Sequence, residues 1–80
     1  MIIVDVEVPA LYKIYDFEID EDTMAGEVTQ KIIVLILQCN QLQRAEEKMY
    51  LYGLRQDKIL NPCMTLREQG IQNGDRLVLL

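Results

Sequence analysis

The stretch TLREQGIQNGDRLVLL, residues 65–80, contains the most specific fold signals in the chain. Thr65 to Gln69 suits one short helical turn, and Gly70 follows as the residue type that commonly ends a helix in a left-handed conformation. The run Asn73-Gly74-Asp75 predicts a tight turn, because these residue types tolerate the backbone conformations that turns require. We therefore expect a helical turn, a tight turn and a final strand from Arg76 to Leu80 in close succession.

Two strands are predicted at the other end of the chain. From Ile2 to Val8, apolar side chains recur at every second position, which is typical of a half-buried strand. Pro9 ends this strand, because proline cannot donate a hydrogen bond to a strand ladder. Ile14 to Ile19 form a second alternating run, and the short connection from Pro9 to Lys13 favours a β-hairpin. The apolar face of the second strand comprises Tyr15, Phe17 and Ile19.

A long helix is predicted after the second strand. Thr23 is a favourable N-cap residue, and we expect the helix from Met24 to Asn40. The apolar run from Ile32 to Leu37 is also compatible with a buried strand, but the length of the segment and its upstream cap favour a helix. One apolar face is predicted at helical spacing: Met24, Val28, Ile32, Leu35, Ile36 and Cys39.

The middle of the chain supplies two more short strands. The polar segment Gln41 to Lys48 is expected to end the helix and turn the chain. Met49 to Gly53 predicts a third strand, and Lys58 to Leu60 predicts a fourth after a turn at Leu54 to Asp57. The whole sequence, residues 1–80, is thus predicted to be one α+β domain with a mixed sheet packed on one helix.

The composition argues against several functions. The 80 residues carry 13 Asp plus Glu against 8 Lys plus Arg, whereas nucleic acids and anionic membrane surfaces attract clustered basic residues. The chain has no histidine, which removes the commonest general base and metal ligand, and two cysteines cannot complete a zinc or iron–sulfur site. No phosphate-binding glycine loop or dinucleotide fingerprint occurs. We therefore expect no enzyme activity, no cofactor and no metal.

Local candidates for chemistry have simpler interpretations. Asp20, Glu21 and Asp22 could hold a cation, but we interpret them as a solvated turn before the helix, because no EF-hand spacing follows. Cys63 lies in a loop and lacks a histidine base for a nucleophilic role. We expect no secretory signal, and the longest apolar run, six residues from Ile32 to Leu37, is far below the about 20 that span a membrane. A cytoplasmic location with reduced thiols is expected.

The predicted element order and the closing segment together resemble the β-grasp arrangement of ubiquitin-like proteins. In that family, a leucine before the short helical turn, an isoleucine after it and alternate leucines of the last strand enter the core. The resemblance implies that the core of this chain includes Leu66, Ile71, Leu77 and Leu79. It also implies that Asn73-Gly74-Asp75 makes the turn into the final strand.

Over nearly its whole length, the chain is most similar to the YukD/EsaB-like branch of small bacterial ubiquitin-like proteins. Members begin with a short hairpin rich in Tyr and Phe, and they end soon after the Gly-Asp turn. They accompany type VII (ESX-type) secretion systems of Gram-positive bacteria, and related domains form the cytosolic part of a membrane component of those systems. The resemblance implies an adaptor that binds a protein non-covalently, with the secretion ATPase or a membrane subunit as partner.

The last residues bear on a different kind of function. Ubiquitin and the bacterial sulfur carriers act through a flexible tail ending in Gly-Gly, which threads a narrow adenylating site. Here the sequence ends Leu77-Val78-Leu79-Leu80 and its last glycine is Gly74, so we do not expect conjugation or sulfur transfer. Two alternatives remain: a carrier or conjugating protein whose tail was removed, and a stand-alone β-grasp interaction module with unrelated partners.

A protein-binding site is predicted on the outer face of the sheet. If Met49 and Leu51 point toward the helix, the two-residue period of a strand sends Tyr50 and Tyr52 to the opposite face. Ubiquitin uses that face, around its third strand, as its main docking surface, and exposed tyrosines suit protein contact. In the alternative orientation the tyrosines belong to the core. The predicted rim residues are Arg55 and Lys58.

A second predicted site lies on the back of the helix. Ile33 and Leu37 are four residues apart and therefore neighbours on the helix surface, with Val34 beside them. Either the segments Gln41 to Lys48 and Asn61 to Met64 fold over these side chains, or the side chains form an exposed apolar stripe. An exposed stripe predicts weak self-association, for which a symmetric homodimer is the simplest form.

Charge is divided unevenly along the chain. The basic residues Arg55, Lys58, Arg67 and Arg76 all lie in the second half. The division is compatible with a solvated polar surface, or with a two-sided interaction surface that orients a partner. The acidic residues of the first half are Asp5, Glu7, Asp16, Glu18, Asp20, Glu21 and Asp22.

Overall fold

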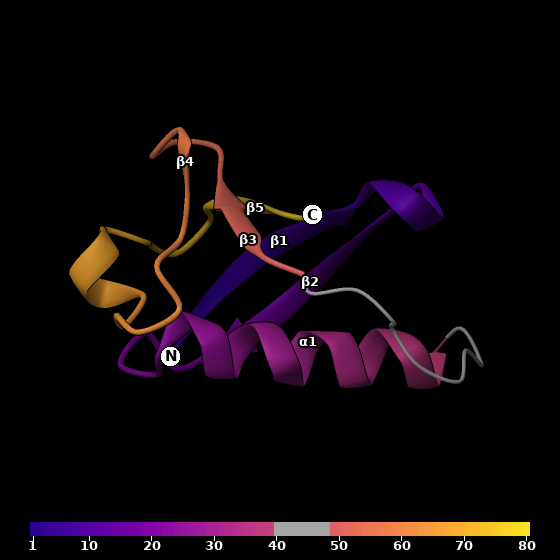
Figure 1. Cartoon of the computed structure of the whole chain (residues 1–80), viewed down its shortest axis with the longest axis horizontal. Coiled ribbons are helices and arrows are strands. Elements are labelled where there is room, and N and C mark those ends of the chain that lie inside the picture. Colours follow the sequence, from indigo (N-terminus) through magenta and orange to yellow (C-terminus); the bar gives the residue numbers. More distant parts are fainter. Residues whose placement is uncertain (40–48) are drawn as a thin grey trace.

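The computed structural model of the chain describes residues 1–39 and 49–80. Figure 1 shows two layers, a single sheet and one long helix that runs across its lower face. The elements follow the predicted order, which confirms the α+β arrangement with a mixed sheet on one helix. The strands are β1 (Ile2–Val8), β2 (Lys13–Ile19), β3 (Leu51–Gly53), β4 (Lys58–Ile59) and β5 (Arg76–Leu79), the helix is α1 (Ala25–Cys39), and two 3₁₀ turns are η1 (Pro9–Leu11) and η2 (Arg67–Gln69).

The sheet brings the first and last strands side by side. Among the described residues its order is β2-β1-β5-β3-β4, with β1 and β5 parallel and the other neighbours antiparallel. The predicted hairpin is confirmed, because β1 pairs with β2 from Ile2 opposite Ile19 to Val8 opposite Lys13. β2 and β4 are therefore the edge strands of the sheet.

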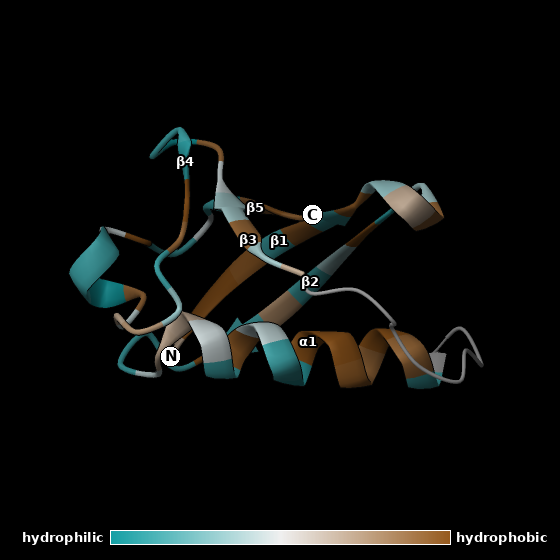
Figure 2. Cartoon of the chain, in the orientation of Figure 1, coloured by the Kyte–Doolittle hydropathy of each residue, from teal (hydrophilic) through white to brown (hydrophobic). Residues whose placement is uncertain are grey.

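The core lies between the sheet and α1. Every second residue of β1, from Ile2 to Val8, is buried, as the alternation predicted. Figure 2 shows the hydrophobic residues concentrated along β1 and along the C-terminal half of α1. Burying one large apolar side chain contributes about 1.5–3 kcal/mol, so this layer is the main source of stability. The core residues inferred from the ubiquitin-like resemblance are all buried, which confirms that prediction: Leu66, Ile71, Leu77 and Leu79.

The start of α1 is held by the segment that precedes the short helical turn. The helix begins at Ala25, so the predicted N-cap Thr23 lies two residues before it. The Ala25 N–H donates to the Met64 carbonyl at 2.8 Å, and the Gly26 N–H donates to the Pro62 carbonyl at 3.0 Å. These backbone bonds satisfy amides that lack a partner inside the helix. A Cβ on Gly26 would lie 2.9 Å from Pro62 Cβ, so this close approach requires glycine.

The buried face of α1 is rotated from the predicted one. Met24 and Leu35 were expected inside but are 53% and 46% exposed, so their assignment to the core was wrong. Thr29 is buried instead, because its hydroxyl donates to the Ala25 carbonyl at 2.7 Å and is satisfied without water. The side chain of Cys39 lies outside the described part of the chain. The buried helix residues are Ala25, Val28, Thr29, Ile32 and Ile36.

The closing segment forms the predicted turns. Gly70 ends η2 with φ +79°, and Gly74 adopts φ +87° before β5, in the left-handed region that favours glycine. This turn also binds the first strand. The Ile3 N–H donates to Asn73 Oδ1 at 2.8 Å, and the Gly74 N–H donates to the Ile3 carbonyl at 2.8 Å.

The third and fourth strands are shorter than predicted. β3 begins two residues later, at Leu51, and β4 ends one residue before the predicted Leu60. Pairing continues past both limits, since Tyr50 and Leu80 exchange two backbone hydrogen bonds of 3.1 and 2.9 Å, and the Leu60 N–H donates to the Leu51 carbonyl at 2.8 Å. The differences are therefore small shifts at element ends.

Candidate protein-binding face

The tyrosines of the third strand lie on the outer face of the sheet, as predicted. Leu51 is only 1% exposed and belongs to the core, and Met49 packs against the core. Strand periodicity then places Tyr50 and Tyr52 on the face away from α1. Tyr50 is 41% exposed and Tyr52 is partly exposed, which confirms this orientation.

The strand register surrounds the tyrosines with apolar neighbours. Tyr52 lies opposite Ile59 of β4 and opposite Val78 of β5, and Tyr50 pairs with Leu80. Ile59 and Leu80 are each about half exposed, whereas Val78 is nearly covered. Directly opposed residues share a face of the sheet, so these side chains form one surface. We call it the tyrosine face, and its members are Tyr50, Tyr52, Ile59, Val78 and Leu80.

The ring of Tyr52 is fixed by a local hydrogen bond. Its hydroxyl donates to Oδ1 of Asp57, and Asp57 occupies the left-handed region with φ +55° in the turn between β3 and β4. This hydrogen bond to the carboxylate raises the pKa of the Tyr52 phenol. The phenol group is therefore oriented before any partner arrives, which lowers the entropy that binding would cost.

Arg55, a predicted rim residue, makes contacts within the fold. Its Nε and Nη2 donate to the two carboxylate oxygens of Asp75 at 3.0 and 2.9 Å, and Nη2 also donates to the Gly70 carbonyl. The side chain of Asp75 is only 11% exposed, and the hydrogen bond from Arg55 lowers its pKa. Arg55 thus joins the turn after β3 to the turn before β5, and its role at the rim of the tyrosine face stays a prediction.

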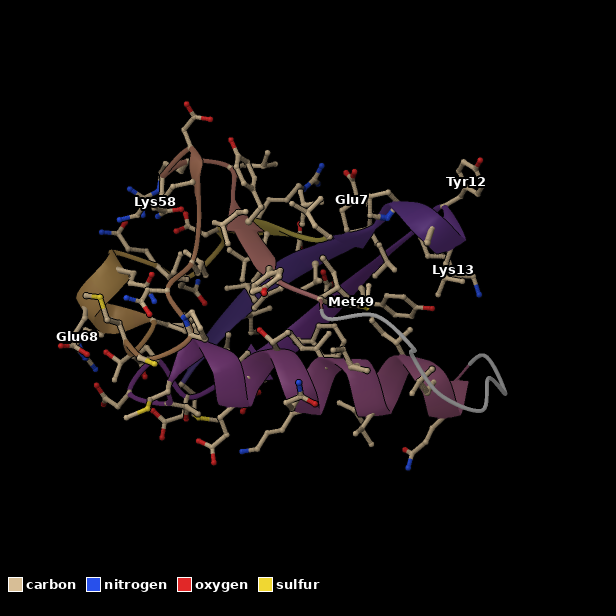
Figure 3. All side chains as sticks on the ribbon, in the orientation of Figure 1. Glu7, Tyr12, Lys13, Met49, Lys58 and Glu68 are labelled. Carbon is tan, nitrogen blue, oxygen red and sulfur yellow. The ribbon has the colours of Figure 1, made fainter. Side chains whose placement is uncertain are left out.

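Lys58, the second predicted rim residue, lies at the edge of the sheet. It is exposed on β4 and forms no ion pair with the described residues. Figure 3 shows it at the β4 end of the molecule, far from Tyr12 and Lys13 at the tip of the β1–β2 hairpin. Lys58 lies opposite Gly53, which in turn lies opposite the core residue Leu77 of β5. The register therefore places Lys58 on the face of the sheet away from Tyr52 and Ile59.

Two basic residues of the second half of the chain pair with acidic residues of the first half. The Arg67 Nε lies 2.7 Å from Asp22 Oδ1, and the Arg76 Nη2 lies 3.6 Å from Asp5 Oδ2. The Arg76–Asp5 pair follows from the parallel pairing of β1 with β5, in which these two residues are partners. The Arg67–Asp22 pair instead joins η2 to the turn before α1, where the Arg67 N–H donates to the Glu21 carbonyl at 2.8 Å. Arg67 and Arg76 are thus each beside an acidic residue, and a two-sided surface that orients a partner stays a prediction.

The acidic turn before α1 has structural partners. Glu21 accepts a hydrogen bond from the N-terminal amine at 3.0 Å, and this bond lowers the pKa of Glu21. Asp22 binds Arg67, whose hydrogen bond lowers the pKa of Asp22. The Asp22 N–H donates to Asp20 Oδ1 at 2.9 Å. The cluster was interpreted as a solvated turn before the helix; it is a turn, and Glu21 and Asp22 have protein partners there.

The apolar stripe on the helix lies elsewhere than predicted. Ile33 and Leu37 are partly buried, and Ile33 packs against the core. The exposed apolar neighbours are Val34 and Leu35, which are 51% and 46% exposed. The segment Asn61 to Met64 does not cover them, because its carbonyls bind the N-terminal end of α1. Residues 41–48, the other predicted cover, lie outside the described residues. The prediction missed Leu35 because it assigned that residue to the core.

The comparisons with known proteins identify the fold. The chain matches no family model and no curated protein. It is similar to the solution structure of a ubiquitin-like domain from an Arabidopsis thaliana protein, with a TM-score of 0.75, 22% identity, and coverage of 99% of this chain and 74% of that one. The chain has the ubiquitin-like β-grasp fold. This result confirms the predicted fold class.

Two further structures with this fold come from assemblies. One is ATBAG1 in complex with HSP70, with a TM-score of 0.72 and 18% identity over all of this chain and 40% of that one. The other is a chain of the MycP5-free ESX-5 inner membrane complex, with a TM-score of 0.77 and 17% identity over 99% of this chain and 20% of that one. At these identities the likeness concerns the fold alone. Among the described helices, none has the length and hydrophobicity needed to span a bilayer.

Proposed function

We propose that the protein is a non-enzymatic ubiquitin-like adaptor that binds another protein non-covalently through the tyrosine face. The observation that carries this proposal is the placement of the apolar side chains on β3 to β5. Leu51, Leu77 and Leu79 already fill the core, so Tyr50, Ile59 and Leu80 remain on the outside. Aromatic and aliphatic side chains that are grouped on an exposed sheet face are a usual feature of an interaction surface.

The chemistry of the face suits a protein partner. A tyrosine ring supplies a large contact area and loses few rotamers on binding, and tyrosines are frequent among the residues that dominate interface energies. The hydrogen bond from Tyr52 to Asp57 fixes one ring in advance.

The proposed cellular setting is the cytoplasmic side of a bacterial type VII (ESX-type) secretion system. Two observations support it: the resemblance of the whole sequence to the YukD/EsaB-like branch, and the shared fold with a chain of the ESX-5 inner membrane complex. In this setting the partner is the secretion ATPase or a membrane subunit.

The direct test measures binding to purified cytosolic domains of those secretion components by calorimetry. Replacing both tyrosines, Tyr50→Ser with Tyr52→Ser, should weaken binding by at least about tenfold while the far-ultraviolet spectrum stays unchanged. The matched control is Tyr12→Ser, because Tyr12 is 97% exposed at the hairpin tip, away from the tyrosine face. Equal weakening by the control would contradict the proposal, and so would unchanged binding by the double variant.

The two alternatives have separate outcomes. A stand-alone module would bind none of the secretion components, although another protein would still depend on Tyr50 and Tyr52. That result would reject the secretion setting and keep the adaptor function. A carrier or conjugating protein would form an acyl-adenylate when incubated with ATP and an adenylating enzyme of the carrier class. Detection of that adduct by mass on the C-terminal carboxylate would contradict the non-covalent role.

A further inference from the structure

The β2 strand is an edge strand whose C-terminal half is open to pairing. Among the described residues, β2 (Lys13–Ile19) pairs only with β1, in a register without interruption. Edge strands are usually closed by proline, by a bulge or by an inward-pointing charge. The half from Asp16 to Ile19 has none of these, since its inward side chains are Phe17 and Ile19.

The hydrogen bonds of β1 show which groups of β2 face the open edge. The Ile3 and Asp5 amides donate toward β5, to Asn73 Oδ1 and to the Asp75 carbonyl. In a strand the backbone groups alternate in direction, so the even-numbered residues of β1 bind β2. The even-numbered residues of β1 lie opposite odd-numbered residues of β2; for example, Val4 lies opposite Phe17. The residues whose N–H and C=O groups face the open edge are therefore Ile14, Asp16 and Glu18.

A groove lies below this edge, between β2 and α1. Its volume is about 200 Å³. Phe17 and Ile19 form the sheet wall and are only partly buried, while Leu35 contributes from the helix and is 46% exposed. Lys31 also lines the groove, where its aliphatic stem can pack against an apolar guest. A strand added to β2 would direct every second side chain into this groove.

The opposite side of the same edge is acidic. Asp16 lies directly across from Asp5, and Glu7 and Glu18 lie on the same outer side of β1 and β2. Figure 3 shows Glu7 pointing away from α1. Like charges directly opposite one another destabilise a sheet, and the hydrogen bond shared with Asp5 raises the pKa of Asp16. Arg76 offsets part of this charge through its pair with Asp5 at 3.6 Å.

We infer that the open edge of β2 binds an extended segment of a partner protein as an additional strand of the sheet. The segment would alternate aliphatic residues, which enter the groove beside Leu35, with Lys or Arg residues, which lie beside Asp16 and Glu18. Main-chain hydrogen bonds to the edge provide affinity in such strand addition, and the alternating pockets provide specificity. The site is separate from the tyrosine face and does not depend on the proposed function.

Charge determines the choice of this occupant over a second copy of the chain. Two β2 strands paired antiparallel about a two-fold axis would share one outer face. Asp16 and Glu18 of both copies would then lie on that face, in two chains that each carry a net charge of −5. A basic segment relieves the same repulsion that a second copy would double.

The test uses a ten-residue peptide that alternates Val and Lys, titrated into the full chain and followed by nuclear magnetic resonance. We expect a dissociation constant below about 1 mM, with slowed hydrogen exchange at the amides of Ile14, Asp16 and Glu18. Two further peptides carry N-methyl groups, one on all valine amides and one on all lysine amides. Alternate amides of an added strand face the edge, so exactly one of these peptides should lose binding.

Protein variants separate the groove from general charge attraction. Leu35→Lys should weaken binding by about tenfold or more, whereas Val34→Lys, an equal change at an exposed neighbour that does not line the groove, should have little effect. A peptide with Glu in place of Lys should not bind. The inference is overturned if the peptide does not bind at 1 mM, a concentration that corresponds to a binding free energy of about −4 kcal/mol. Equal binding of both methylated peptides would also overturn it, and so would chemical shift changes centred on Tyr50 and Tyr52.

Discussion

Replacing Asp75 by asparagine tests whether Arg55 belongs to the fold. The Asp75 carboxylate accepts hydrogen bonds from Arg55 at 3.0 and 2.9 Å and from the Gln72 N–H at 2.9 Å. Its side chain is 11% exposed. The substitution Asp75→Asn keeps the size of the side chain and one acceptor oxygen, but it removes the charge and the second acceptor that the guanidinium needs.

The expected cost follows from the exposure of the two partners. A hydrogen bond to a charged group contributes about 1.5–3 kcal/mol when it is removed from a covered site. The Arg55 side chain is 52% exposed and can recover hydrogen bonds to water, which reduces the loss. The retained oxygen can still accept from the Gln72 N–H. We therefore expect Asp75→Asn to lower the free energy of unfolding by about 1–2 kcal/mol.

The assay is urea unfolding followed by circular dichroism, at neutral pH and in a series toward acid. The hydrogen bond from Arg55 lowers the pKa of Asp75 in the folded state, so its contribution is complete above the unfolded value of 3.8 and is lost as the pH falls through the folded pKa. The gap between parent and variant should therefore close in acid. The matched control Asp5→Asn removes an exposed partner of Arg76 and should change stability less. A gap below about 0.3 kcal/mol at neutral pH, or one that persists unchanged to about pH 2, would refute the reasoning.

Two further predictions concern single turns. Gly74→Ala should lower the melting temperature by about 5 °C or more, because φ is +87° at this position. A Cβ there would meet nothing within 4 Å, so the loss of stability comes from the backbone conformation alone. Gly74→Asn should lower the melting temperature less, because asparagine tolerates this conformation better than alanine. An unchanged melting temperature would show that the turn relaxes. Asp57→Asn should lower the pKa of Tyr52, because the carboxylate that binds the neutral phenol is removed. Spectrophotometric titration against a Tyr52→Phe reference measures this, and an identical tyrosine titration would contradict the assigned hydrogen bond.

The elements that were predictable from sequence depend on chemistry that is local in the chain. Gly70 and Gly74 mark backbone positions with positive φ, and Pro9 ends the first strand. The end of η2, the turn before β5 and the connection between β1 and β2 were therefore predicted correctly. The orientation of Tyr50 and Tyr52 followed from the two-residue period of a strand once Leu51 was placed in the core. None of these predictions depends on the order of the strands in the sheet.

The features that were missed depend on neighbours far apart in the sequence. Arg55 finds Asp75 twenty residues away, and Arg67 finds Asp22 forty-five residues away, so neither pair has a sequence signature. Both pairs join segments that the sheet order β2-β1-β5-β3-β4 and its connections bring together. The helix face was misjudged for a different reason, which is local in the chain. A threonine counts as polar in a periodic pattern, yet Thr29 is buried because its hydroxyl binds the Ala25 carbonyl.

The sheet order also determines how the two proposed binding regions relate to one another. The tyrosine face covers β3, β4 and β5, whereas the open edge belongs to β2, and β1 separates it from β5. A strand added to β2 would extend the sheet away from Tyr50 and Tyr52, so it would not occupy the space of a partner on the tyrosine face. Sites without shared contacts bind independently, and two segments of one partner protein could then bind more tightly together than either does alone. An adaptor with this arrangement would favour a partner that presents both an extended basic segment and a surface for the tyrosines.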